Sequence, residues 1–115
     1  MARKIRRGEI YWVDWSPVRG REQKGLRPAL IIQNDTGNEF SPTTIVASCS
    51  TAVHKPYPFV VPVTAKKTGL PKDCSVSLAQ IFTVDKSRLG DKCGELDEET
   101  MEAVDEAIKI SLSLK

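Results

Sequence analysis

A chain of 115 residues, 40% hydrophobic and 28% charged, fits a single domain spanning residues 1–115 with a modest core. No apolar run approaches the roughly 20 residues that cross a bilayer, and the charged start MARKIRRGEI is not followed by a secretory apolar stretch. We therefore expect a cytoplasmic protein with no membrane role. Residues 1–27 carry eight Lys or Arg against three Asp or Glu, whereas residues 91–107 carry eight acidic residues and one lysine. A basic front suits a polyanion, although an ordinary solvated face is an equal interpretation.

The N-terminal half predicts three strands. β-branched and aromatic residues alternate in residues 9–15 (EIYWVDW), which is typical of a strand. Residues 16–27 (SPVRGREQKGLR) contain two glycines and a proline among charges, which predicts a long exposed loop of the kind that is usually functional. Residues 28–33 (PALIIQ) predict a buried strand, residues 34–42 a turn-rich connection with room for one helical turn, and residues 43–48 (TTIVAS) another strand.

The following segments continue the β pattern. Residues 59–63 (FVVPV) predict a strand whose proline suits an edge or a bulge. Residues 66–73 (KKTGLPKD) predict a turn, residues 74–78 and 80–84 two further strand segments, and residues 85–89 (DKSRL) a short helical turn.

The chain ends in its clearest helix signal. Asp97 is a suitable N-cap followed by acidic residues, and Met101, Val104, Ile108 and Leu112 recur at spacings of three and four, so this face should pack on the sheet. Five or six short strands followed by one helix predict an α+β, mainly β fold. We expect a small, strongly bent antiparallel sheet or barrel with the helix docked on it.

Several kinds of site are excluded by the motifs. The three cysteines, Cys49, Cys74 and Cys93, match neither a CxxC knuckle nor a disulfide framework, so we predict reduced thiols. There is no Walker A, GxGxxG, HExxH or Cys/His cluster, so we predict no metal and no other cofactor. His54 is the sole histidine and no nucleophile elbow accompanies it, which excludes a Ser-His-Asp hydrolase.

Arginine and hydroxyl chemistry remains. RNA supplies its own 2′-OH nucleophile, so a protein need only position the strand, neutralise the phosphorane and move protons. Arg27 precedes Pro28, which favours extended backbone and makes its guanidinium available to a phosphate, although taken alone this position fits an ordinary surface arginine better. The hydroxyls of residues 48–51 (SCST) could contact phosphate or only cap a turn. Gln80 lies among apolar residues, and could be a buried group bonded to backbone or a contact to a base edge.

Three stretches, in this order, resemble the MazF/PemK toxin family: RRGEIYWVDWSPVRGREQKGLRPALIIQND (residues 6–35), SPTTIVASCST (residues 41–51) and SVSLAQIFTVDKSRL (residues 75–89). The resemblance implies an SH3-like, plasmid-maintenance-toxin barrel with a C-terminal helix, and a homodimer that holds RNA at its interface. It further implies a type II toxin that cleaves single-stranded RNA at short sequences without a metal, leaving a 2′,3′-cyclic phosphate and a 5′-OH. The implied protein partner is a cognate MazE-like antitoxin whose acidic tail occupies the RNA groove.

The resemblance also assigns residues. Arg27 is the catalytic arginine that stabilises the phosphorane and assists proton transfer, and Ser50 stands where threonine is more usual, with Thr51 as the alternative hydroxyl. Gln80 matches a glutamine near the active site. The RNA-binding residues implied are Arg21, Glu22, Gln23, Lys24 and Thr51.

Two other functions compete with this reading. One is a gyrase-poisoning toxin of the same fold, which would act on a protein and not on RNA. The other is a non-catalytic SH3-like binding module, supported by the aromatic residues Tyr11, Trp12 and Trp15. Loss of RNA cleavage on Arg27→Ala distinguishes the ribonuclease from both.

Overall fold

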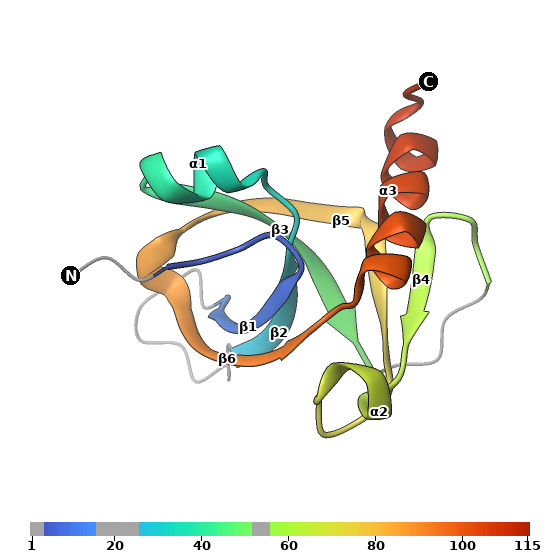
Figure 1. The fold of residues 1–115 in the computed structure, drawn as a ribbon, viewed down its shortest axis with the longest axis horizontal. Coiled ribbons are helices and arrows are strands. Elements are labelled where there is room, and N and C mark those ends of the chain that lie inside the picture. The colour runs from blue at the N-terminus through green and yellow to red at the C-terminus, as the bar shows by residue number, and fades with distance from the viewer. Residues whose placement is uncertain (1–3, 16–25, 52–55) are drawn as a thin grey trace.

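The computed structural model describes residues 4–15, 26–51 and 56–115. Its strands are β1 (Glu9–Asp14), β2 (Leu26–Ile31), β3 (Thr43–Ser50), β4 (Val60–Val63), β5 (Cys74–Asp85) and β6 (Leu89–Glu95). They form one antiparallel sheet in the order β4-β5-β3-β2-β1-β6. Figure 1 shows the sheet curling strongly, with β3 and β5 on one side of the interior and β6 on the other.

The predicted mainly β fold with a C-terminal helix is confirmed, with one difference in the sheet. Within the described part of the chain, β4 and β6 are edge strands, so the sheet is bent without closing into a barrel. Much of the bend falls in β5, where residues 78–80 lie between the pairs Ser48–Ser77 and Ala47–Ile81 as a bulge. A bulge increases local twist and redirects a strand. The proline of β4 lies at an edge as predicted, where its missing N–H costs no ladder bond.

In the described part of the chain, four helical segments accompany the sheet: α1 (Asp35–Phe40), α2 (Ala65–Thr68), the 3₁₀ turn η1 (Lys86–Arg88) and α3 (Glu98–Leu112). The expected helical turns after β2 and β5 are confirmed as α1 and η1. The prediction of a plain turn over residues 66–73 is wrong at its start, because α2 forms there. The Thr64 side chain caps α2 by accepting from the Lys67 N–H, and Gly69 ends it with a φ of 87°.

The strand boundaries differ modestly from the predicted ones. β2 begins two residues earlier than predicted and β3 ends two residues later, while the two segments predicted after residue 73 form the single strand β5. β6 was not predicted as a strand at all. Its sequence, LGDKCGE, has two glycines and no alternation, and it is held in place by pairing with β1.

The core occupies both faces of the sheet because successive residues of a strand point to opposite faces. Ile10 and Leu30 belong to the cluster on which α3 packs, whereas Tyr11, Ala29 and Ile31 belong to the cluster on the other face.

The C-terminal helix α3 stands beside β4 and β5 (Figure 1). The Asp97 cap is confirmed, since its side chain accepts from the Thr100 N–H. Val104 and Ala107 are its buried residues, and the predicted contact of Leu112 is wrong because that side chain is 55% exposed. Among the described helices none is long and apolar enough to cross a membrane.

Candidate functional site

The ends of β2 and β3 bring the two predicted catalytic residues together. Ala29 pairs with Ser48 and Leu30 with Ala47. Continuing this antiparallel register by two residues places Arg27 across from Ser50, on one face of the sheet. A hollow of about 380 Å³ opens here, lined by Arg27, Pro28, Cys49, Ser50 and Thr51. The hollow thus brings together a guanidinium and a hydroxyl that belong to separate motifs.

The charge of Arg27 is available at this hollow. Arg27 is exposed at the start of β2, and no carboxylate of the described residues forms an ion pair with it. A guanidinium stays cationic in proteins and offers planar, paired donors that match two phosphate oxygens. Ser50 is half-buried beside it. The pair can therefore bind a phosphate between a fixed cation and a hydroxyl.

Cys49 forms the inner wall of the hollow and is not a nucleophile there. Its hydrogen bond with Cys74, together with burial, raises the pKa of the Cys49 thiol well above its ordinary value. Cys49 is therefore a neutral thiol at physiological pH, and thiols react as thiolates. All three cysteines are free, as predicted.

Gln80 does not join Arg27 and Ser50. It lies in the bulge of β5, on the other side of β3 from β2, and it does not line the hollow. Its side chain is exposed, so the alternative of a buried amide bonded to backbone is wrong. The apolar neighbours in the sequence suggested burial, but the bulge turns Gln80 outward.

The remaining predicted residues divide into two groups. Thr51 is exposed and lines the hollow next to Ser50. The predicted RNA-binding residues Arg21, Glu22, Gln23 and Lys24, and the histidine His54, lie outside the described residues.

A second hollow, of about 280 Å³, adjoins the first. It is lined by Trp12, Pro28, Thr51, Leu70, Pro71, Lys72 and Cys74. Pro28 and Thr51 line both hollows, so the two lie side by side. Sequence reasoning missed this site, because residues 66–73 carry only turn signals and Trp12 is uninformative by itself.

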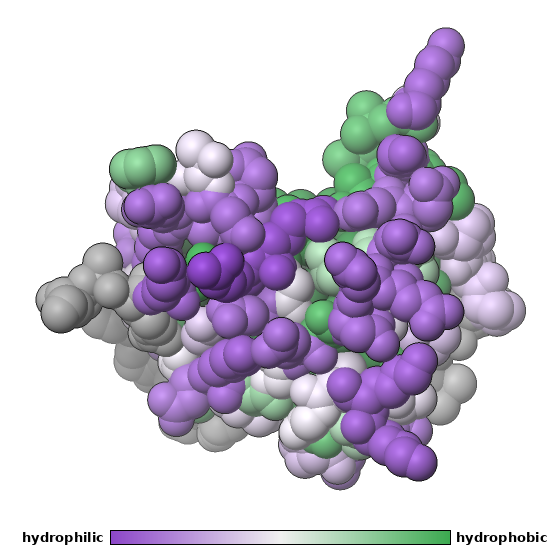
Figure 2. Space-filling model, viewed as in Figure 1, coloured by the Kyte–Doolittle hydropathy of each residue, from purple (hydrophilic) through white to green (hydrophobic). Residues whose placement is uncertain are grey.

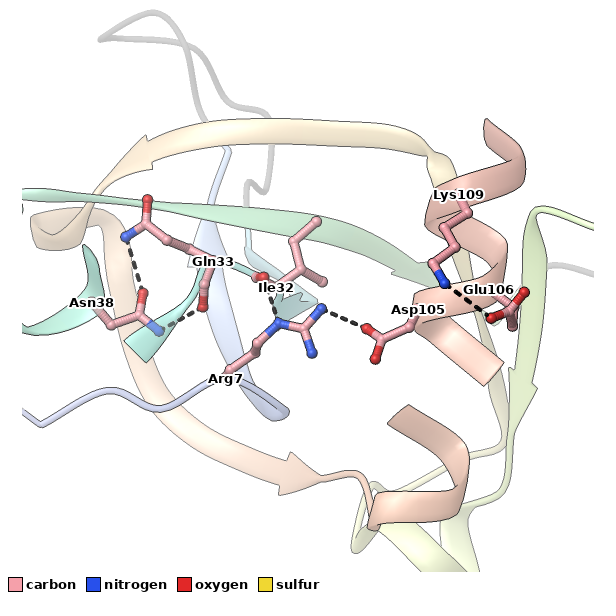
Figure 3. A network of polar contacts seen from close by, with 7 residues as sticks. All are labelled: Arg7, Ile32, Gln33, Asn38, Asp105, Glu106 and Lys109. Carbon is pink, nitrogen blue, oxygen red and sulfur yellow. Dashed lines mark hydrogen bonds and ion pairs between the residues drawn. The ribbon is translucent and has the colours of Figure 1, made fainter. Parts of the chain in front are cut away.

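A larger hollow of about 390 Å³ lies away from this site, between the N-terminal segment, α1 and Lys86. Three of its polar side chains, those of Asp35, Asn38 and Lys86, form hydrogen bonds within the fold. The Lys86 ammonium donates to the Asn38 backbone carbonyl. Gln33 Nε2 donates to Asn38 Oδ1, and Asn38 Nδ2 donates to the Gln33 carbonyl (Figure 3). In the part of the chain that the structure describes, no three His, Cys, Asp or Glu are placed to hold a metal ion.

Comparison with known proteins shows the family to which the chain belongs. Residues 6–112 match the family described as PemK-like, MazF-like toxin of type II toxin-antitoxin system. The chain is 50% identical over 111 residues to Endoribonuclease EndoA of Bacillus subtilis (strain 168), and this alignment covers 96% of each of the two chains.

Solved structures show the same fold. A mycobacterial endoribonuclease in complex with its cognate antitoxin is 25% identical with a TM-score of 0.81, covering 96% of this chain and 97% of that one. A MazE–MazF structure from Deinococcus radiodurans is 22% identical with a TM-score of 0.82, covering 99% and 100%. With the family match spanning nearly the whole sequence, the chain belongs to the PemK-like, MazF-like toxins of type II toxin–antitoxin systems.

Proposed function

We propose that this toxin is a metal-independent endoribonuclease that cleaves single-stranded RNA, chiefly mRNA in the cytoplasm, at short sequences. The observation that carries the proposal is that Arg27 and Ser50 line one open hollow at the ends of the neighbouring strands β2 and β3. The relative at 50% identity is itself named an endoribonuclease. Cleavage of mRNA would stop translation and growth, which is the effect expected of a toxin.

The reaction requires little from the protein. The RNA 2′-oxygen attacks the adjacent phosphorus, the bond from phosphorus to the 5′-oxygen breaks, and the products are a 2′,3′-cyclic phosphate and a 5′-OH. The 2′-OH loses its proton as the 2′-oxygen attacks, and the departing 5′-oxygen gains a proton to become the 5′-OH. Arg27 neutralises charge that grows on the non-bridging oxygens, and it assists proton transfer. Ser50 donates its hydroxyl to a phosphate oxygen and fixes the phosphate against Arg27.

The remaining residue roles are part of the same proposal. Thr51 lines the hollow and contacts RNA, or replaces Ser50 as the active hydroxyl. Gln80 supports the site from outside the hollow. Outside the described residues, the loop positions Arg21, Glu22, Gln23 and Lys24 bind the strand.

We further propose a homodimer and a MazE-like antitoxin partner. Hydrophobic residues gather at the C-terminal end of α3 (Figure 2), where Ile110, Leu112 and Leu114 are all more than half exposed. Exposed apolar groups of this kind suit a protein partner. The mycobacterial relative is described in complex with its cognate antitoxin.

The test is cleavage of a diverse single-stranded RNA pool in EDTA, with the fragment ends mapped. Wild type should cut at one short motif and leave cyclic phosphate ends. Arg27→Ala should lower kcat/KM by roughly 100-fold or more, the loss typical of one transition-state charge donor. Ser50→Ala should lower it by roughly 10- to 100-fold, since one hydrogen bond to a charged phosphate oxygen is lost.

A matched control and two contrary outcomes complete the test. Lys66→Ala removes an exposed cation of α2 and should leave cleavage unchanged. Intact RNA with wild-type protein would overturn the proposal, and gyrase inhibition would then be measured. Activity that requires an added divalent metal would contradict the mechanism.

A further inference from the structure

We propose that the hollow beside Trp12 is a nucleobase subsite, which takes one unstacked RNA base next to the cleaved phosphate. The inference rests on the proposed ribonuclease function and goes beyond it by naming where the sequence is read. Trp12 supplies the stacking surface, and Lys72 contacts the phosphate of the same nucleotide.

The position of the hollow is the first argument. It shares Pro28 and Thr51 with the hollow that holds Arg27 and Ser50. Trp12 pairs with Pro28 and Val13 with Arg27 across β1 and β2, so the Trp12 and Arg27 side chains leave opposite faces of the sheet near the same end of the two strands. The two hollows adjoin at this end through Pro28 and Thr51, so an RNA chain with one phosphate at Arg27 can place an adjacent nucleotide at the Trp12 hollow.

The chemistry of the lining is the second argument. The hollow has mainly apolar walls formed by Trp12, Leu70, Pro71 and Pro28, with a volume of about 280 Å³. Leu70 is buried and belongs to the core, whereas Trp12 is only half-buried although its strand neighbour Ile10 is fully covered. An accessible indole beside a rigid apolar wall suits a flat aromatic ring. Single-stranded RNA is recognised largely by stacking unstacked bases on such side chains.

The charge at the rim is the third argument. Lys72 is exposed and forms no ion pair with any other described residue. Among the described residues, no carboxylate lines this hollow. An apolar slot with one cation at its edge matches a base joined to a phosphate better than it matches an acidic peptide, which would need several cations.

The first experiment measures sequence choice on a randomised RNA pool with wild type, Trp12→Ala and Trp12→Phe. Trp12→Ala should lower kcat/KM on the preferred sequence by roughly 5- to 100-fold, the range of one lost base–aromatic stack. The preference for one base over the others should be lost at one position beside the cut and kept at the other positions of the motif. Trp12→Phe keeps a ring face and should recover most of the loss. The control Phe40→Ala removes an aromatic ring that is 75% exposed on α1, and should change nothing.

The second experiment keeps the proposal falsifiable if Trp12→Ala does not fold. Lys72→Glu alters an exposed side chain, and Lys66→Glu is its matched control on α2. Binding is measured with a DNA oligomer of the preferred sequence, which lacks the 2′-OH and cannot be cut. Lys72→Glu should weaken binding several-fold at low salt and reduce the salt dependence, whereas Lys66→Glu should not.

The outcomes separate the two proposals. If wild type cuts no RNA, the ribonuclease function fails, and the subsite fails with it. If wild type cuts at a motif but folded Trp12→Ala and Lys72→Glu keep its rate and its motif, the subsite alone is overturned. A preference that changes at one position in Trp12→Ala, with Arg27→Ala inactive on every sequence, supports both.

Discussion

The guanidinium of Arg7 donates from Nη2 to Oδ1 of Asp105 at 2.7 Å, which links the segment before β1 to α3 (Figure 3). The same side chain donates from Nε to the carbonyl oxygen of Ile32 at 2.8 Å. Arg7 therefore connects the N-terminal segment, the residue after β2 and the C-terminal helix. Its two contacts differ in kind, because one is a partly exposed ion pair and the other satisfies a backbone carbonyl.

Arg7→Ala should lower the free energy of unfolding by about 1–2 kcal/mol, because it removes both contacts. Asp105→Ala should cost about 0.5–1 kcal/mol, since partly exposed ion pairs are weak. Urea unfolding of both variants and of the double variant gives the coupling energy. Lys109→Ala, which removes the exposed pair with Glu106, is the control and should stay within about 0.5 kcal/mol of wild type. A larger loss from Asp105→Ala than from Arg7→Ala would contradict this account.

The buried amide of Asn38 should matter more than the ion pair. Asn38 is 1% exposed, and its Oδ1 accepts from Thr44 Oγ1 at 2.6 Å and from Gln33 Nε2 at 3.1 Å. Asn38→Ala leaves the fully buried Thr44 hydroxyl without this acceptor and should cost about 2–4 kcal/mol. Thermal or urea unfolding measures the loss.

A second substitution tests the cause. Thr44→Val removes the hydroxyl, so the double variant Asn38→Ala with Thr44→Val should be less destabilised than the sum of the single variants. Additive losses would show that the hydrogen bond between these two side chains is not the reason. Thr36→Ala, at an exposed position of α1, should be close to neutral.

Ser50→Thr should keep or raise RNA cleavage, by up to roughly 10-fold in kcat/KM. The added methyl restricts rotation about χ1 and keeps the hydroxyl, so the donor facing the phosphate loses less freedom on binding. Initial rates on the preferred RNA measure the effect. Ser75→Thr, on the β5 residue that pairs with Ser50, adds the same methyl without altering the hollow's lining and is the control. Activity of Ser50→Thr no better than that of Ser50→Ala would remove the hydroxyl from the mechanism.

The cap of α3 should make stability fall in acid. Hydrogen bonds from the Thr100 side chain and backbone hold the pKa of Asp97 below its ordinary value. The unfolded chain then binds more protons than the folded chain, so this stabilisation is present above pH ~4 and is lost as pH falls through the lower, folded pKa. Asp97→Asn retains an oxygen that can cap the helix and does not titrate. The melting temperature of Asp97→Asn, measured by circular dichroism, should fall less on acidification than that of wild type. Equal falls in the two proteins would show that the Asp97 carboxylate is not the group responsible.

The elements that sequence predicted best are those with a strong local signal. β1 follows from alternating aromatic and β-branched residues, and the start of α3 follows from the Asp97 cap. Local signals do not determine which residues of the helix pack against the sheet. The α3 face is centred on Val104 and Ala107, so the last apolar residue of the predicted stripe, Leu112, is left more than half exposed.

β6 shows why some elements escaped prediction. Its residues have neither alternation nor high strand propensity, and it pairs with β1 through two register shifts. Such a strand exists because a neighbour offers unpaired backbone groups. The same reason applies to the bulge of β5, where three residues have no partner in β3 and Gln80 becomes exposed.

The sequence by itself determined the chemistry of the site: an arginine held extended by Pro28, and hydroxyls at the end of a strand. These are properties of adjacent residues, so they can be read locally. Only the tertiary structure decided that Arg27 and Ser50 line one hollow, that Gln80 stays outside it, and that Trp12 and Lys72 line an adjoining one. Strand register decides those placements, and register depends on burial across the whole sheet, where a shift of one residue would turn each side chain to the opposite face.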